Sequence, residues 1–523
     1  MFVIGFLRSE TTNRAIAYSM SFSMLSRLLT FAQYLVISYY FIASETDIIF
    51  YLLSVAILLT TFVNAVNQQV IVPSVISTRT TYSEEEAKKL ISRIYIIYLM
   101  AGALLTLFLL ISPLGILDKI SRFDTHQISE NKQAIFFMLP VFMLILTNNY
   151  IIDIFTSYRY FTVPMILDMV KNILIILFVL IFKDVLSVSS LALGYLSGYI
   201  IQFIILNIML SNIIKLKVTF KKIKTGILKS KNIIYVIGGQ LAIILNNFII
   251  MYLISSFNEG VFSAMEYGRR INTILIAVIV VQFTTVTGVR IIELYTQKKY
   301  QDINNTFSTY LRAGLFILMP LCIIMSMNAE SVVSIVFERG EFGSEAVRMT
   351  TDFFRIFVLT IPFRLIERFV FRLIIAKQIQ KIGFICHLIS NTVQVIVIWI
   401  LVKNIGYTGY PVGLFLSLFV YAFFILIIVP RKHFDWVKPM PLIKNFFASA
   451  GINLLIAVGI FFIVSLTGTG QSFITKTIIL MALSAMHIIA YAGICLLTGF
   501  NKDIILSGIR IFKLKILKIN REG

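Results

Sequence analysis

Charged side chains are rare in this chain. Asp, Glu, Lys and Arg together make up 14% of its 523 residues, well below the roughly 25% found in soluble domains. Hydrophobic residues make up 58%, and they form runs long enough to cross a bilayer. These proportions exclude an ordinary soluble globular protein. They predict an all-α polytopic membrane protein.

Cysteine and histidine are also few. The three cysteines, Cys322, Cys386 and Cys495, lie far apart inside apolar runs, and the four histidines have no metal-ligand spacing. A disulfide framework and a zinc site are therefore not expected, and we expect neither a metal nor a cofactor. The chain also lacks a phosphate-binding glycine loop, an HExxH zinc motif and a GxSxG nucleophile motif. We therefore do not expect an enzyme.

Acidic residues are outnumbered by basic ones. The chain has 25 Asp and Glu against 46 Lys and Arg, a formal net charge of +21. The basic residues gather in short loops on one side of the apolar runs, as the positive-inside rule requires, so nucleic acid is not an expected partner. The strongest basic segments are 215–231, 430–444 and 510–518. Segment 215–231 is expected either to anchor the topology or to bind acidic membrane lipids.

Apolar runs of about 19–25 residues predict about fourteen membrane-spanning helices, with both termini on the cytoplasmic side. They are expected near 16–41, 48–76, 94–114, 134–157, 163–182, 188–213, 233–257, 264–289, 307–328, 353–375, 382–402, 410–429, 446–466 and 477–498.

The basic segments also divide the chain. We expect an N-terminal lobe (1–214), a basic cytoplasmic linker (215–232), a C-terminal lobe (233–430) and a terminal part with two more spans and a basic tail (431–523). Two six-helix lobes of this kind are typical of transporters built from internal repeats.

An arginine stripe interrupts the run 353–375. Arg364, Arg368 and Arg372 are four residues apart, so they share one helical face, and Glu367 lies beside them. A charge at mid-bilayer costs at least roughly 2.5–3.5 kcal/mol. This face is therefore expected to meet protein or a water-filled cavity rather than lipid.

Other spans carry charged or polar groups as well. Arg27 lies deep in the first span, and Asp168 and Lys171 are spaced to form a buried pair within the fifth. Because arginine is the fork-shaped donor suited to phosphate, the arginines favour a phosphate-bearing substrate. The remaining groups are Asp47, Asp153, Glu266, Arg269 and Arg270, together with a polar face made of Thr60, Asn64, Asn67 and Gln68.

Four segments resemble one transporter family. They are LSRLLTF (25–31), LNNFIIMYLISSF (245–257), EYGRRI (266–271) and VFERGEF (336–342). The last is the most specific, and it is followed at family-like spacing by Pro362, Arg368, Arg372 and the segment 376–378. Together they resemble the MviN/MurJ family of lipid II flippases, in the multidrug/oligosaccharidyl-lipid/polysaccharide exporter superfamily.

This resemblance implies a two-lobed transporter of fourteen helices that works by alternating access. In the family, spans 1, 2, 7 and 8 line a central cavity whose arginines bind the diphosphate. Arg27 and Arg270 correspond to two of them, and Asp47 corresponds to the family's acidic residue at the start of span 2. The second span 1 arginine of the family is replaced here by Gln33, and basic residues of its span 2 by Thr60 and Thr61.

The resemblance thus predicts a flippase for a polyprenyl-diphosphate-linked saccharide in the bacterial cytoplasmic (inner) membrane. It leaves the membrane potential and a monovalent cation open as driving forces, and it makes the cell-envelope synthesis machinery an expected partner. The expected substrate-binding residues are Arg27, Arg269, Arg270, Gln33, Thr60, Asn64 and Asn67. The expected gating or cavity charges are Asp47, Glu266, Arg364, Glu367, Arg368 and Arg372.

Four alternatives stay open at this point. An exporter of surface-polysaccharide repeat units would share the fold, and so would a multidrug or cation exporter. A membrane glycosyltransferase is suggested by the acidic segment 45–47, although the large outer loop that such enzymes carry is absent. A scaffold for envelope assembly would need no substrate site.

Overall fold

The computed structural model describes residues 12–160, 162–216, 233–467 and 473–506, and these contain helices but no β-strand. They form two compact units. The first contains the chain as far as Tyr267 with Phe337–Ala346 and Ile405–Tyr407, and the second contains Gly268–Val336, Val347–Asn404 and the chain from Thr408 onwards.

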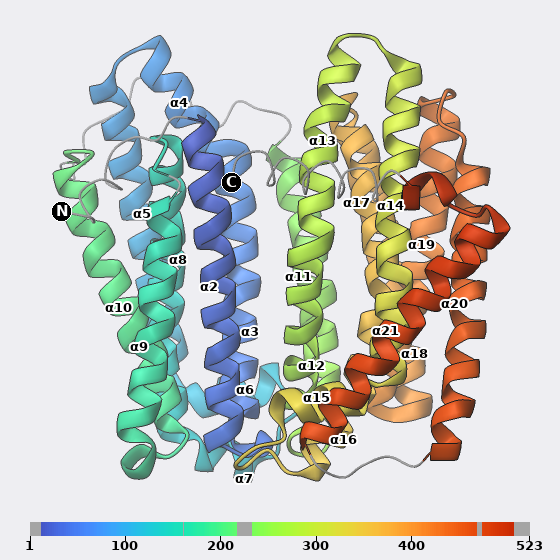
Figure 1. Cartoon of the computed structure of the whole chain (residues 1–523). Helices are drawn as coiled ribbons and strands as arrows, with labels where there is room; N and C mark the ends of the chain where they lie inside the picture. The colour runs from blue at the N-terminus through green and yellow to red at the C-terminus, as the bar shows by residue number, and fades with distance from the viewer. Residues whose placement is uncertain (1–11, 161, 217–232, 468–472, 507–523) are drawn as a thin grey trace, which may run out of the picture. The chain divides into compact units, whose positions relative to one another are not determined.

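The first unit is built mainly from long helices that run side by side (Figure 1). Its elements are α2 (Thr12–Tyr40), α3 (Ala43–Val66), the π-helical η1 (Asn67–Ile71), α4 (Val72–Thr81), α5 (Glu84–Ile111), α6 (Pro113–Ile120), α7 (Thr125–Glu130), α8 (Lys132–Ser157), α9 (Thr162–Leu186), α10 (Ser189–Asn212), α11 (Ile233–Ile254) and the first part of α12 (Val261–Leu275), as far as Tyr267. Helix α8 is central, because α3, α5 and α10 all pack against it.

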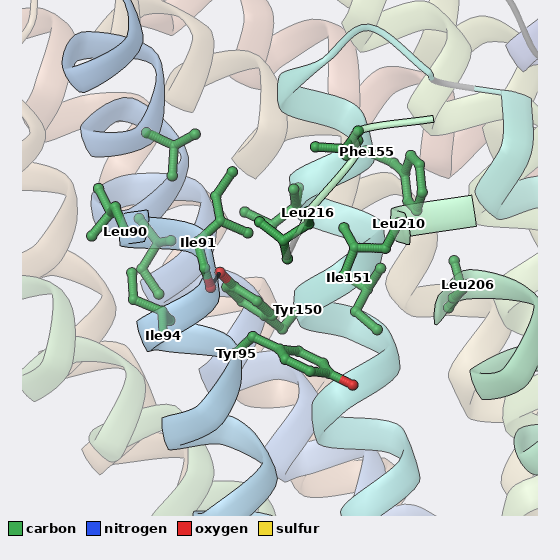
Figure 2. Close-up of a cluster of buried hydrophobic side chains, with 14 of the residues drawn as sticks. Leu90, Ile91, Ile94, Tyr95, Tyr150, Ile151, Phe155, Leu206, Leu210 and Leu216 are labelled. Carbon is green, nitrogen blue, oxygen red and sulfur yellow. Dashed lines mark hydrogen bonds between the residues drawn. The ribbon is translucent and has the colours of Figure 1, made fainter. Parts of the chain in front are cut away.

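A buried cluster joins α5, α8 and α10 in this unit. Figure 2 shows Tyr150 on α8 beside Tyr95 and Ile91 of α5, with Leu206 of α10 on the other side. The Tyr150 hydroxyl donates a hydrogen bond of 2.8 Å to the Ile91 carbonyl. The ring of Tyr98 stacks on Tyr150 with 4.9 Å between centroids. Since lipid is as apolar as these side chains, such close packing and hydrogen bonding hold the helices together.

The second unit contains the rest of the helices. They are the second part of α12 from Gly268 onwards, the π-helical η2 (Ile276–Val280), α13 (Val281–Thr296), α14 (Tyr300–Met327), most of α15 (Ala329–Phe337) and of α16 (Ser344–Phe357), the 3-10 turn η3 (Val358–Thr360), α17 (Ile361–Ala376), most of α18 (Gln380–Ile405), the last residue of the turn η4 (Gly406–Thr408), α19 (Gly409–His433), α20 (Pro439–Thr467) and α21 (Phe473–Thr498). Helix α14 packs against α13, α17 and α20, and α17 also packs against α13 and α19.

Helices α20 and α21 are joined by a row of buried polar contacts. The Ser449 and Tyr491 hydroxyls lie 3.0 Å apart. His487 Nε2 lies 2.9 Å from Asn453 Oδ1, and both residues are almost fully buried. Such interhelical hydrogen bonds are a common way to fix two helices against each other in a membrane.

Ten segments of the described chain are long and apolar enough to cross a membrane, including Ala43–Thr81 and Lys381–His433. Each expected apolar run coincides with a helix or with consecutive helices. The expected all-α polytopic fold is confirmed. The count of fourteen spans and the lobe boundaries stay predictions, and the basic segment 510–518 and most of 215–231 lie outside the described residues.

Candidate functional site

Helix α2 carries two of the expected substrate contacts in different surroundings. Arg27 is exposed. Gln33 is 2% exposed and donates a hydrogen bond of 2.6 Å to the Tyr195 hydroxyl of α10. Between them, Thr30 accepts a hydrogen bond of 2.8 Å from Asn172 of α9. Arg27 is therefore available to a ligand, whereas Gln33 holds α2 against α10.

Two side chains of the polar face of the second span bind the carboxylate of Asp153, which lies on another helix. The sequence pattern did not predict this contact. Asn67 and Gln68 donate hydrogen bonds of 2.8 and 2.5 Å to the two oxygens of Asp153 on α8. The Tyr98 hydroxyl donates a hydrogen bond of 2.8 Å to the side-chain oxygen of Asn67. The π-helical turn Asn67–Ile71 adds a residue to the turn, so adjacent side chains can reach one acceptor.

Thr60 and Asn64 lie further along the same helix. Both are half-buried. The Thr60 hydroxyl donates to the Ala56 carbonyl at 3.0 Å and lies 3.5 Å from the Asn149 amide of α8. This part of the face keeps some polar surface free of the helix packing.

Asp47 holds the start of α12. Its carboxylate accepts backbone N–H groups of Gly260 at 2.6 Å and Ser263 at 2.7 Å, and its side chain is almost fully buried. The amide of Gln127 is 3.5 Å away. The first N–H groups of a helix lack partners within the helix, and its N-terminus carries partial positive charge. A carboxylate from α3 thus satisfies donors 213 and 216 residues away in sequence.

Glu266 lies one turn further along α12. It is 1% exposed and accepts a hydrogen bond of 3.2 Å from Ser54 of α3. Next to it, Tyr267 is packed among aromatic rings, with the centroid of Phe337 at 5.0 Å and that of Phe342 at 5.1 Å. Glu266 therefore strengthens the α3–α12 contact made by Asp47.

The VFERGEF segment is anchored to the end of α2. Glu341 donates its backbone N–H to the Tyr39 carbonyl at 3.1 Å. Gly340 has a φ of +59°, and a Cβ there would lie 2.1 Å from the Tyr39 oxygen. Only glycine suits this position, since it combines a left-handed backbone with a close approach.

The second unit contains the other expected arginines. Arg269 and Arg270 are half-buried on α12. On α17, Arg364 forms an ion pair of 3.1 Å with Glu367, and His387 of α18 lies 4.0 Å from the same carboxylate. These contacts explain the burial of Glu367.

The stripe itself divides into separate environments. Arg368 is exposed. Arg372 lies over Gly288 of α13, where an added Cβ would come within 2.5 Å of its Cδ. The stripe therefore does not form one uniform charged surface.

The expected span over 353–375 consists of two helices joined by a short turn. Helix α16 ends at Phe357, a 3-10 turn follows, and α17 begins at Ile361 with Pro362 in its first turn. Proline lacks an N–H, and its ring would clash with the carbonyl of Val358 in a continuous helix. The expectation of a buried Asp168–Lys171 pair is wrong for the acid, because the Asp168 side chain is 47% exposed.

Nearly the whole of this chain matches one family of membrane proteins. A family model described as "Lipid II flippase MurJ" matches residues 15–483. The chain belongs to the MurJ family. The resemblance to this family is confirmed, and the alternative transporters and the glycosyltransferase are not favoured.

Curated MurJ proteins are similar over part of their length. A probable lipid II flippase MurJ of Buchnera aphidicola is 27% identical over 231 residues, covering 41% of this chain and 42% of that protein. The probable lipid II flippase MurJ of Aquifex aeolicus is 23% identical over 263 residues, covering 49% and 51%. The matched region thus spans about half of these relatives, or less.

Solved structures share the MurJ fold over more of the chain. A lipid II flippase MurJ in an inward closed conformation matches with a TM-score of 0.77 at 19% identity, covering 94% of this chain and 100% of that one. An inward-facing multidrug transporter of the MATE family matches with a TM-score of 0.62 at 14% identity, covering 80% and 98%. At these identities the comparison shows the fold alone.

The sequence did not predict several of the contacts at the candidate site. Asp153, Gln127, Ser263 and Tyr195 each bind an expected site residue through a contact between distant helices. Only Asp153 gave a signal, since it is a lone carboxylate within an apolar run.

Proposed function

We propose that this protein is a flippase that moves a polyprenyl-diphosphate-linked saccharide of the lipid II type across the bacterial cytoplasmic membrane. The observation that carries the proposal is the family match over residues 15–483. The fold, shared with a MurJ structure over 94% of the chain, supports it. The protein would act as a transporter rather than an enzyme, with both termini in the cytoplasm.

Arginines would hold the diphosphate. Arg27, Arg269 and Arg270 are the proposed contacts, because a guanidinium can donate two parallel hydrogen bonds to a phosphate. Arg27 is exposed, as a binding residue must be. The half-buried Thr60 and Asn64 would meet sugar hydroxyls, while Asn67 and Gln33 would act through Asp153 and Tyr195.

Alternating access would move the two proposed lobes, 1–214 and 233–430, against each other. The contact of Asp47 with the α12 N-terminus is the proposed gate element, with Glu266 beside it. The charges of α17, namely Arg364, Glu367, Arg368 and Arg372, would line the polar path or its inner mouth. Cations near the phosphates lower the free energy needed to carry them through the bilayer. The membrane potential or a monovalent cation would drive the return step.

The first test is genetic complementation. We expect the chain to restore growth and cell shape to bacteria depleted of their own lipid II flippase, and the double variant Arg27→Ala/Arg270→Ala to fail at equal expression. Arg93→Ala is a matched control, because Arg93 is an exposed arginine on α5 away from the proposed contacts.

The second test follows the lipid directly. Lipid II on the outer face is counted with a membrane-impermeant enzyme that cleaves it. Outer-face lipid II should fall when the flippase is depleted and recover with the wild-type chain. Growth restored by the double variant would refute the arginine assignment, and no recovery with the wild-type chain would refute lipid II as substrate.

A further inference from the structure

An ion pair lies inside the spanning helix α9. The Lys171 Nζ is 2.7 Å from Asp168 Oδ1, and the Lys171 side chain is 14% exposed against 47% for Asp168. The ammonium also lies 4.7 Å from the centroid of the Tyr199 ring on α10. Lys171 is thus held by the α9–α10 packing, while the carboxylate points out of it.

The exposed carboxylate does not lie on the lipid-facing side of α9. The large exposed apolar residues of this helix include Ile173, Leu177 and Ile181. At 3.6 residues per turn these lie roughly opposite Asp168. Asp168 instead continues the stripe of Asn172 and Ile175, which are buried. The exposure of Asp168 therefore shows that this side of α9 is not fully covered by neighbouring helices at that level.

Two contacts fix the register of α9 against α2. Asn172 bonds to Thr30 at 2.8 Å, and the Lys183 ammonium lies 4.9 Å from the Tyr40 ring centroid. Residue numbers rise together along the two helices, so they run parallel. Helix positions one turn before the Thr30–Asn172 bond are then level with each other.

Arg27 and Asp168 occupy these level positions. Arg27 lies three residues before Thr30, and Asp168 four before Asn172, about 4.5 and 6 Å lower along their helices. Both are at least partly exposed. Within the described part of the chain, no ion pair joins them. An exposed cation and a partly exposed carboxylate thus lie level with each other on adjacent, parallel helices.

Such a pair suits a ligand that has a phosphate next to hydrogen-bond donors. Packed helix axes are about 8–10 Å apart, a distance that a diphosphate and its first sugar ring can bridge. A carboxylate accepts hydrogen bonds from hydroxyl or ammonium groups, and it repels a bare phosphate. Lys171 balances the charge of Asp168 and fixes its orientation through the 2.7 Å contact.

We propose that Asp168 binds the donor groups of the saccharide head group beside the phosphate held by Arg27, with Lys171 as its positioning residue. This inference rests on the proposed function and adds a contact on α9 that decides which head groups are accepted. Asp168 recognises the group attached to the diphosphate, whereas Arg27 binds the diphosphate itself.

The test uses the full chain in phosphatidylcholine nanodiscs, since that headgroup has no hydrogen-bond donor. Binding of lipid II and of undecaprenyl diphosphate without saccharide is measured for each variant. We expect Asp168→Asn to weaken lipid II binding about tenfold, the loss of one hydrogen bond to a charged group, and to change undecaprenyl diphosphate binding less than about twofold. Arg27→Ala should weaken both.

Two further variants separate binding from folding. Asp184→Asn breaks the matched Lys183–Asp184 pair at the end of the same helix, also 2.7 Å long, and should bind like the wild type. Asp168→Asn/Lys171→Met removes the whole pair. If the pair were only structural, this double variant would regain lipid II binding together with its thermal stability. We expect it to stay about tenfold weaker for lipid II.

Three further results would each overturn the inference. Equal lipid II binding by Asp168→Asn and the wild type would overturn the inference and leave the flippase proposal standing. Displacement of lipid II by phosphatidylethanolamine from the wild type but not from Asp168→Asn would assign the site to a membrane headgroup and overturn the saccharide assignment. Failure of the wild type to bind either polyprenyl ligand would overturn the function and the inference together. Lipid II with an acetylated peptide amine distinguishes hydroxyl from ammonium donors.

Discussion

Removing the Asp47 carboxylate should release the first turn of α12. In Asp47→Ala the N–H groups of Gly260 and Ser263 lose acceptors at 2.6 and 2.7 Å in a buried position. A hydrogen bond to a charged group contributes about 1.5–3 kcal/mol, and a buried donor left unpaired adds to the loss. The α12 N-terminus also loses the charge that opposes its dipole.

Asp47→Asn separates these effects. The amide keeps one oxygen as an acceptor, so one of the two N–H groups stays satisfied and the other does not. We expect a local loss of about 2 kcal/mol, which corresponds to about a 30-fold faster opening-limited exchange. Asp47→Ala should show a larger effect at both amides.

Hydrogen–deuterium exchange of peptides covering 258–266 measures this directly. Asp124→Ala provides the control, because Asp124 is exposed and caps a different helix, α7, through the His126 N–H at 2.7 Å. It should speed exchange in α7 and leave 258–266 unchanged. Unchanged protection of 258–266 in Asp47→Ala would refute the capping role.

Three further predictions concern unfolding midpoints of the purified protein in detergent. Gly340→Ala should lower the free energy of unfolding by about 1–2 kcal/mol from the left-handed backbone alone, and more from the contact with Tyr39, whereas Gly343→Ala, with open space around it, should have little effect. Asp153→Ala should cost about 1–3 kcal/mol because two amide donors lose their acceptor, and a wild-type midpoint would contradict that network. Glu367→Ala should cost only about 1 kcal/mol, since its arginine partner is 37% exposed and screened; a loss several times larger would show that the pair is shielded from water.

The membrane-spanning helices could be predicted from hydropathy because the bilayer imposes one requirement on every span. The bends could not, since the π-helical turns at Asn67–Ile71 and Ile276–Val280 have no strong sequence signal. Pro362 lies where the run 353–375 is interrupted, and a proline is a signal of a bend that hydropathy alone does not use.

The candidate site was predicted less completely, because its contacts join distant parts of the chain. Gln33 and Tyr195 are 162 residues apart, and Asn67 and Asp153 are 86 apart. Hydropathy places each residue in a span but gives neither the rotation nor the neighbours of that helix. The role of Asp47 shows the same limit, since its position at a helix start was clear and its target on α12 was not.

The polar row between α20 and α21 has a consequence for how the chain enters the membrane. Asn453 and His487 satisfy each other, and Ser449 and Tyr491 do the same. Either helix alone would bring these groups into hydrocarbon without partners, at a free-energy cost that each pair removes. We therefore expect α20 to remain at the translocation machinery until α21 is synthesised, so that the two helices insert into the lipid together as a hairpin.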